Sequence, residues 1–176
     1  MLELMMHCHY LIAPEYVRVG MPEVTLPVIP GMEGCHWILR KSSAENTNAM
    51  LEMLLNGRQI SAKQAVGYLV DYSGTFTECL SVIGDILRND AKALPKRKII
   101  EEALTHIEAA VRQVPLSDNQ QIREAQTEIA DCVIASCSAT ADEALLLQSK
   151  ASARFIAGKL FRKGKIGIEY DKTYQN

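Results

Sequence analysis

The sequence has no apolar run long enough to cross a membrane, and it has hardly any net charge. A membrane-spanning helix needs roughly 18 or more consecutive apolar residues, and no stretch of this chain approaches that length. The 19 basic and 21 acidic side chains leave a net charge of −2, which gives no electrostatic reason to expect a nucleic-acid partner. No basic segment followed by an apolar stretch opens the chain, so we expect a cytoplasmic protein without a secretory signal.

Paired cysteines are also missing. The five cysteines are an odd number and no two of them form a C-x-x-C pair. Without a secretory signal, this favours reduced thiols, and Cys132 and Cys137 fit an apolar helical pattern as small core residues. His7 and His9 face apart on a helix and no further ligands cluster nearby, so we assign no metal site.

The N-terminal third consists of short apolar stretches separated by prolines and glycines. We expect a short helix over 2–8, strands over 10–13 and 17–20, and an extended segment around Glu23 that Pro22 holds. Proline at this density excludes a helix in that segment.

After Gly34 the apolar residues follow helical spacing, and cap signals mark several helix ends. A short strand is expected over 68–71 and an irregular tail from Gly164. Capping boxes begin at Ser61 and Thr140. The spacing predicts helices over 43–55, 76–87, 99–111, 122–137 and 140–157. So few strands beside so many helices suggest a sheet whose other members lie outside this chain.

Three segments in order resemble the enoyl-CoA hydratase/isomerase (crotonase) family. Residues 21–34, M-P-E-V-T-L-P-V-I-P-G-M-E-G, are similar to the family's P-E-x-x-x-G-x-x-P-G-x-G-G segment. Residues 49–71 resemble its A-x-x-x-x-L-x-G-x-x-I-S-A-x-x-A and L-V-D signature, and residues 3–13 resemble its E-L-A-M-x-C-D-x-x-x-A run. The resemblance covers residues 3–71, and further along only a helical C-terminal part is shared.

The resemblance implies an α/β protein of the crotonase-like (ClpP/crotonase) spiral fold, truncated at its N-terminus and mainly helical toward its C-terminus. Residues 1–72 would form a partial core that carries the chemistry. Residues 73–176 would form a helical region that takes part in a homo-oligomer, a trimer or a dimer of trimers. The implied reaction is the addition of water to a 2-enoyl-CoA thioester, with an acyl-CoA substrate and no separate cofactor.

Two glutamates carry this chemistry by resemblance. Glu3 and Glu23 occupy the positions of the family's two catalytic carboxylates, with the family's separation of 20 residues (23 − 3). Hydration needs one group to take a proton from water and another to deliver one to the α-carbon. Two carboxyls in a partly dry site push their pKa values apart, but the sequence leaves open which one is the acid. Gly31 falls where the family places a glycine whose N–H helps hold the water; an ordinary turn glycine is the alternative.

Three further residues are assigned to substrate binding. Met21 lies in the same segment, and Glu33 replaces a family glycine next to the site; a helix-start acid favoured by the macrodipole is the alternative for Glu33. Lys163 belongs to a basic patch that could contact the CoA phosphates or form a solvated helix end.

The start of the chain departs from the family. A G-G-G-x-E stretch precedes the first glutamate in the family and supplies half of the oxyanion hole, whereas this chain begins Met1-Leu2-Glu3. One such donor is typically worth roughly 2.7–4 kcal/mol, so we expect the chain alone to be a poor catalyst and to belong to a longer enzyme. The alternatives are a non-catalytic remnant acting as an oligomerisation module and a crotonase-type acyl-CoA isomerase or hydrolase. Strands 10–13 and 17–20 are expected to lack neighbours, which would leave an apolar face and a sheet edge open.

Overall fold

The computed structural model describes residues 2–26, 28–42, 44–90 and 93–158. The strands are β1 (Ile12–Pro14), β2 (Arg18–Gly20), β3 (Gln59–Ser61) and β4 (Tyr72–Gly74). Three short 3-10 helices are η1 (Pro22–Thr25), η2 (Ala44–Asn46) and η3 (Lys63–Ala65). The α-helices are α1 (Leu2–Met6), α2 (Gly34–Lys41), α3 (Thr47–Asn56), α4 (Phe76–Leu87), α5 (Ile107–Val111), α6 (Gln120–Cys137) and α7 (Ala141–Ala157). Within the described part, none of these helices has the length and apolar character that a membrane span requires.

The four strands form two small sheets. β1 pairs in parallel with β4, with Ile12 opposite Tyr72, and β2 pairs antiparallel with β3, with Arg18 opposite Ser61. The expectation that strands 10–13 and 17–20 lack neighbours was therefore wrong, because later segments of the same chain pair with both. The strand expected over 68–71 was also wrong. Residues 68–70 form a turn whose N–H groups donate to the carbonyl of Ala65, the N–H of Asp71 donates to that of Leu11, and the strand begins at Tyr72.

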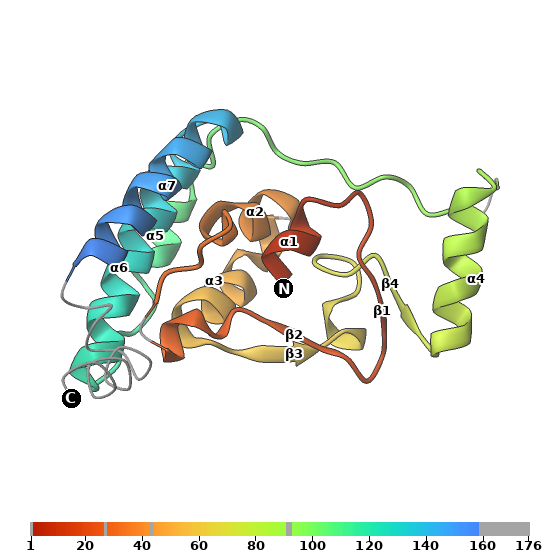
Figure 1. Cartoon of the computed structure of the whole chain (residues 1–176), viewed down its shortest axis with the longest axis horizontal. Helices are drawn as coiled ribbons and strands as arrows, with labels where there is room; N and C mark the ends of the chain where they lie inside the picture. The colour runs from red at the N-terminus through yellow and green to blue at the C-terminus, as the bar shows by residue number, and fades with distance from the viewer. Residues whose placement is uncertain (1, 27, 43, 91–92, 159–176) are drawn as a thin grey trace, which may run out of the picture.

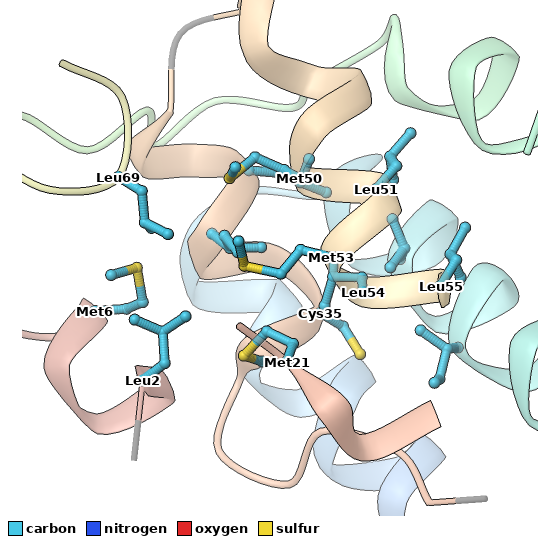
Figure 2. Packing of buried hydrophobic residues seen from close by; sticks show 14 of the residues in the cluster. Leu2, Met6, Met21, Cys35, Met50, Leu51, Met53, Leu54, Leu55 and Leu69 are labelled. Carbon is cyan, nitrogen blue, oxygen red and sulfur yellow. The ribbon is translucent and has the colours of Figure 1, made fainter. Parts of the chain in front are cut away.

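The hydrophobic core lies where α3 packs against η1, α2, α5 and α6, and α2 and α6 in turn pack on α1 and α7 (Figure 1). Six of the ten residues of α3 are buried. In Figure 2 the side chain of Met53 extends toward Leu2 and Met6 of α1, whereas Leu51 and Leu55 lie on the other side of the helix. The same cluster continues from Leu2 to Phe155 in α7. The prediction that Cys132 and Cys137 are core residues is confirmed, since both are buried.

Three of the helices predicted from spacing lie close to their expected positions. α4, α6 and α7 lie within two residues of their expected bounds, and Thr140 and Glu143 form the expected capping box of α7. Ser61 and Gln64 also exchange the capping hydrogen bonds, although only the short η3 turn follows them. The first helix ends at Met6 instead of residue 8.

The helix expected over 99–111 was wrong for most of its length, because only Ile107–Val111 is helical. The chain from residue 93 to 106 instead runs without helix across the body, from α4 to α5 (Figure 1). Arg40 explains this path. Its Nη1 donates to the carbonyls of residues 100, 101 and 102, and its Nη2 donates to those of Ser136 and Ala139. Carbonyls bonded in this way hold the segment on α2, and this outweighs its local helical pattern.

The segment around Glu23 is the other correction. It was expected to be extended, yet Pro22–Thr25 forms the 3-10 helix η1 with Pro22 at its start. A proline fits that position because the first N–H of a helix has no helical partner and the fixed φ suits a helical turn. The turn brings Val24 into the core against α3 and α6, and it places Glu23 beside α1.

Helix α4 lies at one end of the molecule, where it contacts β1 and β4 (Figure 1). Its apolar residues Phe76, Leu80 and Leu87 are exposed, whereas Cys79 is buried. A groove of about 340 Å³ lies between α4 and the segment from α1 to β1. Exposed apolar surface is therefore present on α4. It was expected on the strands over 10–13 and 17–20, which pair with β4 and β3.

Candidate active site

Glu3 lies on α1 with only 7% of its surface exposed, and its carboxylate meets the start of α2. Oε1 accepts hydrogen bonds from the backbone N–H of Met32, at 2.8 Å, and from that of Gly34, at 3.0 Å. The first N–H groups of a helix have no helical partner and carry partial positive charge. Glu3 satisfies them, and they in turn stabilise negative charge on its Oε1.

The backbone of Glu33 makes this geometry possible. Its φ of 64° is in the left-handed region, which few residues other than glycine adopt. A left-handed residue between two others turns the flanking N–H groups into one anion-binding hollow. The two N–H groups that reach Glu3 are those on either side of Glu33. The position suits the glycine that the family places there.

Gly34 cannot be replaced by a larger residue without disturbing this hollow. A Cβ at this position would overlap the methyl group of Met21 and would lie 2.6 Å from Glu3 Oε1. Met21 is 1% exposed, so its side chain has little room to move away. Figure 2 shows Met21 beside Cys35, at the start of α2. The structure thus places the expected substrate-binding residue Met21 against the hollow that holds Glu3.

Glu23 has very different surroundings. It lies half-buried in η1, and its Oε2 is buried with no hydrogen-bond partner among the described residues. Burial raises the pKa of the Glu23 carboxyl, and the negative charge of nearby Glu3 raises it further, against a hydrogen bond from its own backbone N–H. The structure therefore couples the two glutamates electrostatically, and it shifts Glu23 toward its protonated form relative to an ordinary glutamate.

The side chain of Glu33 turns toward aromatic neighbours. Its Oε2 accepts from Trp37 Nε1 at 2.6 Å and lies 3.3 Å from His7 Nε2. Its Oε1 lies 3.9 Å from His36 Nε2, but burial and the charge of Arg40 lower the pKa of His36 to about 4. His36 is therefore neutral near pH 7 and forms no ion pair there. Glu33 also lines a groove of about 540 Å³, and its expected contact with substrate stays a prediction.

Two other expected site residues stay predictions. Gly31 is exposed, and a Cβ there would meet nothing within 4 Å. The N–H groups that bind Glu3 belong to Met32 and Gly34, so sequence reasoning missed these two donors. Lys163 lies outside the described residues.

Sequence reasoning also missed Gln148 of α7, whose side chain binds the segment that carries the two donors. Its signal in the sequence was a polar residue within a stripe of small and apolar residues at helical spacing, Ala144, Gln148, Ala151 and Phe155. Periodicity alone does not distinguish such a residue from an exposed one.

Known proteins resemble this chain in both sequence and fold. No family model matches it. It is 40% identical to the "Peroxisomal bifunctional enzyme" of Cavia porcellus over 65 residues, which are 37% of this chain and 8% of that protein. It is 40% identical to a "Probable enoyl-CoA hydratase" of Rhizobium meliloti (strain 1021) over 63 residues, which are 36% of this chain and 23% of the relative.

The fold is similar to the crystal structure of an enoyl-CoA hydratase from Rhodobacter sphaeroides 2.4.1. The TM-score is 0.58 at 16% sequence identity, and the match covers 95% of this chain and 56% of that one. The chain thus spans about half the length of this structure and a smaller share of the two relatives. The expected crotonase-type α/β fold is confirmed over the part that the chain spans. Sequence and fold comparisons both support the resemblance to the enoyl-CoA hydratase/isomerase (crotonase) family, over the part of those proteins that the chain spans.

Proposed function

We propose that this chain carries the acid/base pair of an enzyme that hydrates 2-enoyl-CoA thioesters. One observation carries the proposal: two interacting glutamates have opposite surroundings. Glu3 accepts two N–H donors, which favour negative charge, whereas Glu23 has a buried, unpartnered oxygen and a raised pKa. A base and an acid in one site are what the addition of water to a conjugated double bond requires.

Glu3 acts as the base in this proposal. Both of its N–H donors bind Oε1, so we assign Oε2 to take the proton from water. As that proton leaves, the water oxygen forms a bond to the β-carbon of the substrate. The electrons of the double bond move toward the thioester carbonyl.

Glu23 acts as the acid. Its carboxyl delivers its proton to the α-carbon, so that one proton and one hydroxyl group have been added across the double bond. Delivery of both from a single site gives syn addition. The pair returns to its starting state when Glu3 loses its new proton and Glu23 regains one, through exchange with solvent.

The relatives support the acyl-CoA substrate, since the matched proteins include enoyl-CoA hydratases. The chain spans only part of them, so the proposed activity is that of the whole protein to which these residues contribute. The expected homo-oligomer, a trimer or a dimer of trimers, stays a prediction. Leu145, Leu146 and Ile156 of α7 offer exposed apolar surface for it. The cytoplasmic location also stays a prediction, and one matched relative is a peroxisomal enzyme.

The test is hydration of crotonyl-CoA by the purified protein and by Glu3→Gln and Glu23→Gln variants. Acid/base groups typically contribute about 10²–10⁴-fold, so each variant should lose at least about 100-fold in kcat. The control is Glu15→Gln, which removes an exposed carboxylate paired with Lys63 and should keep full activity. Turnover that survives in both variants would contradict the proposal.

The same variants separate the alternatives. An isomerase that moves a double bond often keeps one of the two carboxyls, so it would depend on only one of them. Absence of both turnover and crotonyl-CoA binding in the unaltered protein would favour the non-catalytic remnant.

A further inference from the structure

Gln148 is a buried polar side chain at a helix interface. It lies on α7 with 1% of its surface exposed, in line with Ala144, Ala151 and Phe155, which are also buried. Burying an amide costs free energy unless its donor and acceptor atoms find partners. An apolar residue would suffice here if the position served only the packing of α7 on the body.

Both polar atoms of Gln148 bind the segment that holds Glu3. Its Nε2 donates to the carbonyl of Pro30 at 2.7 Å, and its Oε1 accepts from the N–H of Cys35 at 3.1 Å. Between these two attachment points lie Met32 and Gly34, the residues whose N–H groups donate to Glu3. Gln148 therefore binds the segment 30–35 at both of its ends, although it lies on a helix more than 110 residues further along the chain.

We infer that Gln148 is a positioning residue for the base Glu3: it holds segment 30–35 so that the N–H groups of Met32 and Gly34 converge on the carboxylate. This inference rests on the proposed function for the role of Glu3. The left-handed backbone of Glu33 strengthens it, since such a conformation persists only where the surrounding structure holds it in place. Gln148 does so by fixing the backbone before and after Glu33.

The chain offers a matched control in Gln126 of α6. Gln126 is 2% exposed and also binds backbone, accepting from the N–H of Ser117 and donating to the carbonyl of Leu55. Its bonds lie outside segment 30–35. Gln126→Met therefore reports what the loss of any buried glutamine does to the protein.

The experiment is amide hydrogen exchange by NMR on the whole chain, comparing Gln148→Met with Gln126→Met. Methionine keeps the size of glutamine but forms neither bond. In Gln148→Met, exchange at Met32 and Gly34 should accelerate about ten-fold more than at buried amides of α6, as expected for the loss of local hydrogen bonds. In Gln126→Met these two amides should follow the rest of the core.

Gln148→Glu is the second variant, in case the methionine fails to fold. It keeps an acceptor for Cys35 but places a carboxyl oxygen against the Pro30 carbonyl, so exchange at Met32 and Gly34 should accelerate at least as much as in Gln148→Met. Equal acceleration at all buried amides in the Gln148 variants, or the same local effect in Gln126→Met, would overturn the inference.

Turnover provides a readout that a purely structural role would not change. If the unaltered protein hydrates crotonyl-CoA, Gln148→Met should lower kcat with little change in KM, whereas Gln126→Met should lower neither. The kcat values are compared per folded molecule, with the folded fraction measured for each variant. A loss of kcat in Gln148→Met that disappears after this correction would contradict positioning. An unaltered protein without turnover counts against the proposed function alone, because the exchange comparison still decides the role of Gln148.

Discussion

The surroundings of Glu3 and those of Glu23 are built in opposite ways, although the two carboxyls share one site. Around Glu3, the N–H groups of Met32 and Gly34 are the donors, and Gln148 binds the segment that carries them. Arg40, at the other end of α2, binds that helix to the carbonyls of residues 100–102 and Ser136. Around Glu23, one 3-10 turn leaves a carboxyl oxygen buried and without a partner among the described residues. In the proposed mechanism, the surrounding groups therefore assign the two roles, since the residue type is the same.

Replacement of Arg40 should have the largest effect on stability, because its side chain binds α2 to the carbonyls of residues 100–102 and of Ser136. Arg40→Met leaves several carbonyls of the 100–102 segment and of Ser136 without their donor. We expect the free energy of unfolding to fall by roughly 3–5 kcal/mol, measured by chemical denaturation. Arg88→Met is the control, since it removes an exposed pair with Asp85 on α4 and should change stability by less than about 0.5 kcal/mol. Similar losses in the free energy of unfolding of the two variants would show that the Arg40 hydrogen bonds do not stabilise the packing of α2.

A methyl group at Gly34 should disturb the surroundings of Glu3 more locally than the loss of Arg40 does. Gly34→Ala would overlap Met21 and press on the Glu3 carboxylate, so we expect a loss of about 1–3 kcal/mol in the free energy of unfolding, together with loss of turnover. Gly31→Ala places the same methyl in open space and should be nearly neutral. Equal stability and turnover of the two variants would be evidence against the close contact.

The cap of α7 should have a smaller effect. Thr140→Ala removes the side chain that accepts from the N–H of Glu143, and such caps are worth about 1 kcal/mol in the free energy of unfolding. Thermal or denaturant unfolding measures this loss. Thr127→Ala, which alters an exposed hydroxyl within α6, should change stability by less than about 0.5 kcal/mol. A larger loss at Thr127 than at Thr140 would contradict the capping assignment.

Glu23→Gln should have the smallest effect on stability, with a sign set by pH. Because burial raises the pKa of Glu23, the folded state binds its proton more tightly than the unfolded state does. The stability of the unaltered protein should therefore fall as pH rises from below the ordinary glutamate value through the folded pKa. Glu23→Gln has no carboxyl to lose a proton, so its stability should not fall in this way. It should therefore be more stable than the unaltered protein at neutral pH and no more stable in acid.

Glu78 provides a comparison of opposite sign. Its hydrogen bond from the backbone N–H of Thr75 lowers its pKa, so it contributes stability at neutral pH that is lost as pH falls through its folded pKa. Denaturation of Glu78→Gln across the same pH range should show a loss at neutral pH. If both variants gained stability at neutral pH, or both lost it, the opposite pKa shifts of Glu23 and Glu78 would be contradicted.

Local signals predicted much of the fold, and long-range contacts explain the failures. Helical spacing and capping boxes placed α4, α6 and α7 correctly. The segment before α5 also has helical spacing, yet Arg40, some 60 residues earlier, draws its carbonyls into another path. Pro22 was taken to exclude a helix, although a proline fits the first position of η1.

The same limit applies to the site. Resemblance in sequence pointed to Glu3 and Glu23. In the structure the charge of Glu3 acts on Glu23, and their catalytic roles stay predictions. Gln148 and the N–H donors of Met32 and Gly34 were not predictable, because backbone donors have no sequence signature. A glutamine in an apolar stripe also does not indicate which distant segment it binds.

The most direct test of the contrast between the two glutamates is a pH titration of the Glu23 carboxyl by carbon-13 NMR in the intact protein. The account predicts a midpoint above the ordinary glutamate value of about 4.3, and a lower midpoint when Glu3→Gln removes the neighbouring charge. A midpoint at or below the ordinary value would contradict the assignment of Glu23 as the acid.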